Sequence, residues 1–222
     1  MKTQLPVAGP PHLPPPLPPT AAAPAMRVMV VLQGGPEQQR RLMELRTLFT
    51  QACNALAPQV SQTRCWNRVA LHHMAYKPLR EQFPQLGSQM ACNVIYSVSR
   101  AARLAYQHPA SPYNLTRTGS RPLPVLRFNG SVPVYFDRHT LSVRAGEVSL
   151  FTLDGRIRFK VDLSPETEVR FRREKLREIV LAQRPDGAWS LRFDFALPAD
   201  ADAPAIETDW PEYLVLASTL DP

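Results

Sequence analysis

The chain has 222 residues, 44% of them hydrophobic, and a formal net charge of +7 at pH 7. Such a length and composition favour a globular protein with one sizeable domain or two small ones. No run of residues approaches the roughly 20 apolar residues of a membrane-spanning helix, and the N-terminus lacks the apolar stretch of a signal peptide. We therefore expect a soluble cytoplasmic protein that has no contact with a membrane.

Enzyme motifs are absent from the sequence. It has no Gly-rich nucleotide loop, no zinc-protease motif and no nucleophile elbow, and Asp154 and Asp186 fit turns better than a catalytic pair. The three cysteines, Cys53, Cys65 and Cys92, show neither a disulfide framework nor the paired spacing of a zinc site, so reduced core thiols are the simplest interpretation. We expect no catalytic residues, no metal and no cofactor.

Charge is unevenly distributed along the chain. The segment 64–144 contains eleven basic residues and two acidic ones, whereas the segment 186–222 contains eight acidic residues and one basic residue. A central block rich in arginine suits phosphate binding, because guanidinium groups grip phosphate oxygens with two parallel hydrogen bonds. The block therefore favours nucleic-acid binding over the alternative, a solvated basic face.

The first 25 residues contain nine prolines and almost no charge. Such a segment favours an extended, disordered coil that cannot build a core. Two alternatives are that it is a ligand for a proline-reading domain and that translation starts at Met26. The valine-rich segment 26–34 that follows predicts a strand.

A helical region is predicted from residue 35 to residue 121. Pro36 and Glu37 are favourable in a first helical turn, and apolar residues then recur at helical spacing as far as Leu56, after which Pro58 is expected to end the helix. Further helical stretches are expected at 61–76, as a short piece at 77–84, and at 88–107.

The stretch 88–107 has two different faces. One is apolar and is expected to pack against the other helices: Met90, Val94, Val98, Ala101 and Ala105. The other is polar and cationic: Gln89, Asn93, Ser97, Arg100 and Arg103. We expect the polar face to be free to bind a ligand.

Beyond Pro122 the hydrophobic pattern changes to the period of two that is typical of strands. Turn pairs are expected at 129–130, 145–146, 154–155 and 186–187. About seven short strands of this kind favour a barrel or sandwich, with the strand 26–34 as an additional member and the helices as an insertion. The predicted fold class is therefore α+β. The chain closes with an apolar strand at 213–217, after which no further strand is predicted.

Two features favour contacts with nucleic acid. Aromatic side chains lie among the basic residues of the central block, where they can stack on unpaired bases or belong to the core: Trp66, Tyr76, Tyr96, Tyr106, Tyr113 and Tyr135. A second cationic cluster is expected in a loop between two strands: Arg170, Arg172, Arg173, Lys175 and Arg177.

Four stretches resemble the N-terminal half of the TnpB (OrfB-type) proteins of insertion sequences, relatives of type V CRISPR effectors. RVMVVLQGGPEQQRRLMELRTLFTQACNALA is similar to the family's opening strand, its Pro-x-x-Gln helix start and its Asn-x-x-hydrophobic helix end. LHHMAYKPLREQFPQLGSQMACNVIYSVSRAARLA is similar to its Tyr-x-x-Leu-Arg-x-x-Phe segment and Val-rich helix. SLFTLDGRIRFKV and KLREIVLAQRPDGAWSLRFDFALP resemble its strand pairs before the catalytic domain. The likeness covers roughly 26–216.

This resemblance implies an antiparallel barrel of the oligonucleotide-binding type, the wedge domain, with a helical recognition domain inserted after its first strand. The expected parts are a disordered tail (1–25), the first barrel strand (26–34), the helical insertion (35–121), the barrel (122–198), and an acidic linker with the first strand of a nuclease domain (199–222). In the family these parts bind the guide RNA and read a short DNA motif.

Cleavage in the family belongs to a RuvC-like domain with three metal-binding acids, followed by a zinc ribbon. Where the family has Gly-x-Asp-x-Gly, this chain has residues 217–221, which puts Thr219 at the position of the metal-binding acid; a shifted alignment puts Asp221 there. The other acids and the zinc cysteines have no counterparts, so two-metal cleavage cannot be assembled. The resemblance therefore implies a truncated, nuclease-deficient protein that binds RNA and DNA without cutting.

The resemblance and the charge pattern together select candidate site residues. The candidates for reading double-stranded DNA are Lys77, Arg80, Ser88, Gln89, Asn93, Ser97 and Arg100. The candidates for binding a structured guide-type RNA are Arg127, Arg170, Arg172, Arg173 and Lys175. A separately encoded nuclease domain is a further possible partner, docking on 210–222. The alternatives are one subunit of a split endonuclease, a pseudogene fragment, and a non-enzymatic β-barrel adaptor.

Overall fold

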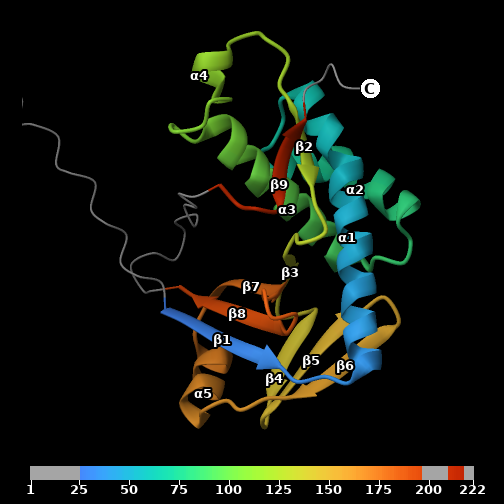
Figure 1. Ribbon diagram of the computed structural model, residues 1–222, viewed down its shortest axis with the longest axis vertical. Helices are drawn as coiled ribbons and strands as arrows, with labels where there is room; N and C mark the ends of the chain where they lie inside the picture. The colour runs from blue at the N-terminus through green and yellow to red at the C-terminus, as the bar shows by residue number, and fades with distance from the viewer. Residues whose placement is uncertain (1–25, 197–209, 218–222) are drawn as a thin grey trace, which may run out of the picture.

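A computed structural model describes residues 26–196 and 210–217. Figure 1 shows a helical half at the top and a β-rich half at the bottom, connected by one long helix. The helices are α1 (Pro36–Thr63), α2 (Arg68–Gln82), α3 (Ser88–Gln107), α4 (Leu115–Thr118) and α5 (Pro165–Arg173). The strands are β1 (Met26–Leu32), β2 (Val125–Phe128), β3 (Val134–Phe136), β4 (Leu141–Arg144), β5 (Glu147–Thr152), β6 (Gly155–Lys160), β7 (Leu176–Gln183), β8 (Trp189–Phe195) and β9 (Leu214–Ala217). The fold is α+β.

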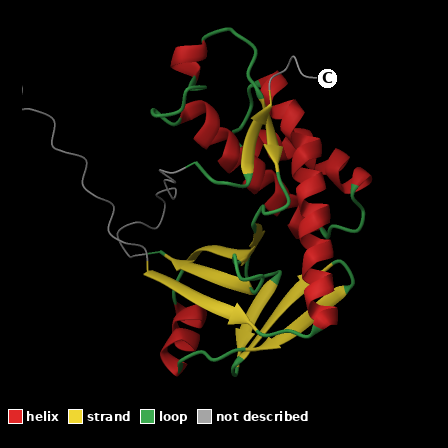
Figure 2. Ribbon diagram, in the orientation of Figure 1, coloured by secondary structure: helices red, strands yellow, loops and turns green. Residues whose placement is uncertain are grey.

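The strands of the described residues form three antiparallel sheets, which Figure 2 shows in yellow. Their strand orders are β1-β8-β7-β3, β4-β5-β6 and β2-β9. The expected closed barrel is not formed by these residues, because the row of strands is interrupted twice. The strand β3 pairs with β7 and not with β4, and β2 pairs with β9 and not with β3.

The first strand is joined to the strands that follow the helices. β1 runs antiparallel to β8 over its whole length, from the pair Met26–Phe195 to the pair Leu32–Trp189. Alternate side chains of β1 are buried, as in a strand with one face on the core. The helices α1 to α4 therefore lie, in the sequence, between two neighbouring strands of one sheet.

The prediction that Pro58 ends the first helix is wrong. α1 continues through Pro58 to Thr63, and α2 likewise contains Pro78. An interior proline costs about 3 kcal/mol because it lacks a backbone donor and its ring crowds the preceding turn. In α1 the buried residues Leu56 and Val60, on either side of the proline, offset this cost by packing in the core. The helix ends instead at Arg64, which adopts the left-handed conformation with φ 53°.

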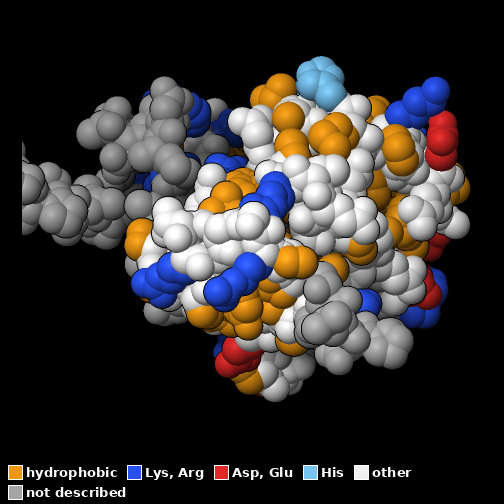
Figure 3. All heavy atoms as spheres, turned by 90° about the horizontal axis from the view of Figure 1, so that it is seen from above, with side chains coloured by type: hydrophobic (Ala, Val, Ile, Leu, Met, Phe, Trp, Pro, Cys, Tyr) orange, Lys and Arg blue, Asp and Glu red, His pale blue; other side chains and the backbone are white. Residues whose placement is uncertain are grey.

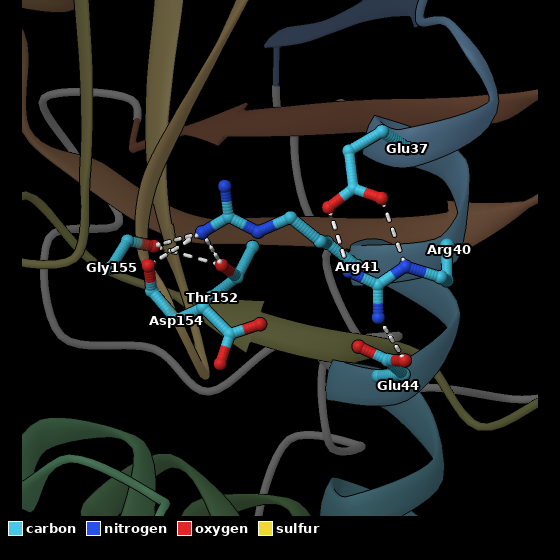
Figure 4. Close-up of polar contacts among 7 residues, drawn as sticks. All are labelled: Glu37, Arg40, Arg41, Glu44, Thr152, Asp154 and Gly155. Atoms are coloured by element: carbon cyan, nitrogen blue, oxygen red, sulfur yellow. Dashed lines mark hydrogen bonds and ion pairs between the residues drawn. The ribbon is translucent and has the colours of Figure 1, made fainter.

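The start of α1 is attached to the neighbouring sheet by two side chains. The Gln38 amide donates to the carbonyl of Arg158 (2.6 Å) in β6, while its oxygen accepts from the Gly35 backbone N–H (2.8 Å). Arg41 donates to the hydroxyl of Thr152 (2.6 Å) and to the carbonyls of Asp154 and Gly155 at the β5–β6 turn, as Figure 4 shows. The long helix is thereby fixed to the β-rich half.

Close packing at this junction predicts that Gly34→Ala destabilises the protein. A methyl group at Gly34 would lie 2.7 Å from the buried ring of Phe159 and 3.1 Å from Cβ of Gln38. Because neither neighbour is at the free end of a flexible side chain, we expect a loss of about 1–3 kcal/mol in urea unfolding. Gly130→Ala is the matched control, since no atom lies within 4 Å of the new methyl group. Equal stability of the two variants would contradict the prediction.

Three of the four expected hairpin turns are confirmed. Ala145 and Gly146 both have positive φ, as a two-residue turn between β4 and β5 requires, and Gly155 and Gly187 have positive φ at the other two turns. The hairpin expected at 129–130 is wrong. Asn129 instead accepts a hydrogen bond from Ser131 N–H and donates one to the Glu212 carbonyl, which directs the chain toward β9.

The apolar strand near the end of the sequence does have a neighbouring strand. β9 pairs antiparallel with β2, from the pair Val125–Ala217 to the pair Phe128–Leu214. Leu214 is buried, and β2 lies against α1. The strand predicted near the end of the chain therefore pairs within the described residues, with a strand that precedes it by about 90 residues. The linker at 199–209 and the last residues 218–222 lie outside the described residues, as does the proline-rich tail.

One hydrophobic cluster extends through both halves of the molecule. Cys53 is fully buried within it, and burial raises the pKa of its thiol, so this group stays protonated. All three cysteines are free. Of the helices in the described residues, none combines the length and apolar composition needed to cross a membrane.

Candidate nucleic-acid interface

The polar face of α3, predicted to be free for a ligand, packs against the β-rich half. Asn93 and Ser97 are 6% and 3% exposed. The Asn93 amide donates to the carbonyl of Tyr135 in β3 (2.8 Å), so it satisfies a buried backbone acceptor. Asn93 therefore holds α3 on the sheet, and Ser97 is buried, so the expectation of a free face does not hold for either residue.

Arg100 belongs to a buried ion-pair network between α3 and β7. It pairs with the Glu178 carboxylate, whose side chain is 5% exposed, and Glu178 also accepts from the Tyr96 hydroxyl. On the other side, Arg192 lies 3.6 Å from the same carboxylate and 3.0 Å from Asp194. Burial raises the pKa of the Tyr96 hydroxyl, which favours its neutral, donating form. The Arg100 guanidinium is therefore committed to an internal acid.

The remaining DNA-reading candidates lie where α2 ends and α3 begins. Lys77 and Ser88 are exposed and Gln89 is half-buried. Arg80 donates to the carbonyl of Leu86, so its guanidinium closes the connection between the two helices. The structure thus leaves Lys77, Ser88 and Gln89 accessible from outside, on one corner of the helical half.

The second cationic cluster is not the expected loop, since Arg170, Arg172 and Arg173 lie in the helix α5 and Arg177 lies in β7. Ser164 caps α5 by accepting from Thr167 N–H (3.2 Å), Pro165 occupies the first turn, and three arginines lie in the last turn. Acids at the start and cations at the end of a helix both interact favourably with its dipole. Glu168 accepts from the backbone N–H groups of Ala145 and Gly146, which attaches α5 to the β4–β5 turn.

The end of α5 presents several cations at the surface. Arg172, Arg173 and Lys175 are exposed, while Arg170 is half-buried with its Nε 3.8 Å from the Glu174 carboxylate. Arg138 lies at the same end and donates to the carbonyl of Glu174. Arg127, the fifth RNA-binding candidate, is exposed on β2 in the other half of the molecule, away from α5 (Figure 1).

A third group of cations was missed in the sequence and lies on one face of the sheet β4–β5–β6. We call this the cationic sheet face and define it by the side chains that alternate outward from the three strands: Ser142, Arg144, Glu147, Ser149, Phe151, Arg156, Arg158 and Lys160. The inward side chains of the same strands are buried and apolar. Among the outward residues of these strands there are four cations and one acid. The sequence does contain a signal for this face, because a cation occupies every second position of β6.

The cations of this face surround one shallow groove. It has a volume of about 480 Å³, and it is lined by Ser142, Arg144, Glu147, Ser149, Arg156 and Arg158. Arg158 is 72% exposed, and its Nε lies 3.6 Å from the Glu147 carboxylate, too exposed a pair to fix it firmly. The side chains that line this groove thus give it a net positive charge.

Most of the aromatic side chains expected near a ligand belong to the core. Trp66, Tyr106 and Tyr135 are at most 6% exposed, and the Tyr106 hydroxyl donates to the Pro124 carbonyl (2.6 Å). Tyr113 is 36% exposed. Rings that do lie beside surface cations include Tyr96, which has the exposed Arg68 5.1 Å over it, and Phe151 on the cationic sheet face, which is 40% exposed.

A second groove lies at the helical end, where Figure 3 shows apolar side chains gathered at the surface with lysine and arginine between them. It has a volume of about 560 Å³, and its lining includes Leu104, His108, Tyr113, Trp210, Leu214 and Val215. Residues from the described part of the segment 210–222 line this groove. Docking of a separately encoded nuclease domain there stays a prediction.

No model of a known protein family matches the chain, and no curated protein matches it. Within the described residues, no group of three or more histidine, cysteine, aspartate or glutamate side chains is placed to hold a metal ion. The surfaces described above are therefore the features from which a function can be inferred.

Proposed function

We propose that the protein binds nucleic acid, with guide-type RNA and double-stranded DNA as its ligands, and that it does not cleave them. The observation that carries this proposal is the cationic sheet face, where Arg144, Arg156, Arg158 and Lys160 oppose a single acid. Solvated faces usually mix both signs, whereas phosphate-binding surfaces concentrate cations. The exposed cations at the end of α5 supply a second positive surface on the same β-rich half.

The wider likeness to TnpB-type proteins is part of this proposal. It is supported by the pairing of β1 with β8, because a strand before the helices and a strand after them then belong to one sheet. A relation of these sheets to an oligonucleotide-binding barrel belongs to the proposal in the same way. Within it, RNA is assigned to the β-rich half and the DNA motif to the corner around Lys77 and Ser88.

The proposal predicts salt-sensitive binding that depends on the sheet face. The probes are RNA transcribed from the DNA that flanks the coding sequence and a DNA duplex. Replacing Arg144, Arg158 and Lys160 together with glutamine is expected to flatten the slope of log K against log[salt] for the RNA by about 2, since each phosphate contact on a single strand contributes about 0.7.

The matched control removes the same charge elsewhere, as Arg117→Gln, Arg121→Gln and Arg184→Gln, and is expected to keep the original slope. Binding that does not respond to salt, or equal slopes for the two triple variants, would overturn the proposal. Incubation of the complex with Mg²⁺ is expected to leave both nucleic acids intact, and a metal-dependent cut in either would refute the non-cleaving part.

A further inference from the structure

An arginine lies over an exposed aromatic ring on the cationic sheet face. Phe151 and Arg156 are opposite each other on β5 and β6, and the guanidinium carbon of Arg156 is 4.1 Å from the centre of the Phe151 ring. This is a close cation–π contact, within the roughly 6 Å over which such contacts are attractive. Both side chains are exposed, so the pair is a surface feature and not a part of the core.

Hydrogen bonds hold this arginine in place from both sides. One terminal nitrogen of Arg156 donates to the carbonyl (3.2 Å) and hydroxyl (3.3 Å) of Ser149, and the other donates to the carbonyl of His139 (3.1 Å). An exposed arginine side chain carries about 2 kcal/mol of rotamer entropy, and here much of that freedom is already restricted. The planar guanidinium group of Arg156 is therefore already held in one orientation before a ligand binds.

A restrained planar cation over an aromatic ring is a surface on which unpaired bases stack. Duplexes hide the faces of their bases between neighbouring pairs, so they can use such a surface only at an end. Arg158 and Lys160 follow Arg156 on the same face of β6, separated by about 6.6 Å each because successive outward residues are two strand steps of about 3.3 Å apart. A flexible single-stranded backbone can adapt its phosphates to this row.

We propose that the cationic sheet face binds single-stranded nucleic acid, with one base stacked on the Arg156–Phe151 pair and the backbone following Arg158 and Lys160 along β6. This inference names the ligand class of the site on which the proposed function depends, and it rests on that function. The groove beside Ser142 and Ser149 accommodates the sugar and phosphate next to the stacked base. Arg144 lies across the groove as a further phosphate partner.

The test separates charge from planarity. Arg156→Lys keeps the charge but removes the planar group, and Phe151→Leu removes the ring but keeps an apolar side chain. Each is expected to weaken binding of a ten-nucleotide oligouridylate by about 5- to 150-fold, the range that one stacked base contributes, without changing the salt slope. An RNA duplex of the same length with mixed sequence is expected to bind more weakly than the single strand and to be unaffected by either variant.

Control variants and probes distinguish a failure of this inference from a failure of the proposed function. Arg184→Lys is the same substitution at an exposed site on the β7–β8 turn and is expected to bind as the original protein does. Thermal unfolding of every variant establishes that it is folded, and a folded Arg156→Lys variant suffices if Phe151→Leu is not. A parallel oligodeoxyuridylate, which differs only in the 2′-hydroxyl, shows whether the sugar matters: equal binding of the two strands assigns recognition to base and phosphate alone, as we expect.

Two outcomes overturn the inference while the proposed function survives. One is unchanged single-strand binding in both stacking variants, and the other is an RNA duplex that binds as tightly as the single strand; in both cases salt-sensitive binding persists. The proposed function fails separately, if the unsubstituted protein shows no salt-sensitive binding to any of the probes.

Discussion

Replacing Glu178 with alanine is expected to lower the free energy of unfolding by about 3–5 kcal/mol, the cost typical of breaking a buried ion pair from one side. The Glu178 carboxylate accepts from Tyr96 and pairs with Arg100, and Arg192 lies within 3.6 Å of it. Its removal leaves two arginines and a hydroxyl around a site that no longer holds a negative charge. Urea unfolding followed by circular dichroism measures the loss.

Two further variants give this prediction its controls. Glu44→Ala removes a carboxylate that pairs with Arg40 on the exposed surface of α1, visible in Figure 4, and is expected to cost less than about 1 kcal/mol. The double variant Arg100→Met with Glu178→Leu replaces the pair by apolar groups and is expected to lose less than Glu178→Ala alone. A loss for Glu178→Ala as small as that for Glu44→Ala would show that burial of the pair contributes little.

Parts of the fold that depend on short-range chemistry were predictable from the sequence. The turns at Gly146, Gly155 and Gly187 each contain a glycine, which adopts positive φ without strain, and this is a local property. The helix α5 could also have been predicted, because Ser164 and Pro165 followed by acidic residues are typical of a helix start. It was missed because the charge of its last turn was given more weight than the cap at its first.

Long-range pairing was not predictable in the same way. The strand β9 pairs with β2 across about 90 residues, and no local pattern in either strand specifies that partner. The burial of Asn93 is a similar case. Its amide donates to the carbonyl of Tyr135, but the sequence around it does not distinguish a buried asparagine from one that faces water. The prediction of a free polar face on α3 was wrong for this reason. The same reason explains why Arg100, which pairs with a buried acid, was predicted to bind DNA at the surface.

The cations of β6 on the cationic sheet face could have been found in the sequence, but they lie outside the two segments in which charge was counted. Arg156, Arg158 and Lys160 alternate with buried residues, and two of them follow the Gly155 turn within a few residues. A period of two tells which side chains share a face, but not whether that face is covered by a helix. Only the placement of α1 at the edge of the sheet, held by Gln38 and Arg41, shows that the face itself stays open.

Replacing Asn54 with alanine is expected to cost about 2–4 kcal/mol, because one side chain satisfies two backbone groups. The Asn54 amide donates to the Phe128 carbonyl (2.9 Å), and its oxygen accepts from the Phe128 N–H (2.8 Å). Asn54 therefore pairs with the edge of β2 as a neighbouring strand would. It stands in the Asn-x-x-hydrophobic motif interpreted as a helix end, yet α1 continues past it to Thr63.

The loss is expected to be local as well as global, since β2 is the strand on which β9 pairs. Hydrogen exchange of the Phe128 amide is expected to accelerate far more in Asn54→Ala than exchange in β7 and β8, which pair with each other in a different sheet. Gln51→Ala, an exposed position one turn earlier on α1, is the control and is expected to stay within about 0.5 kcal/mol of the original stability. Continued protection of the Phe128 amide in Asn54→Ala would mean that another group holds the β2 edge, and that the two-stranded sheet does not depend on α1.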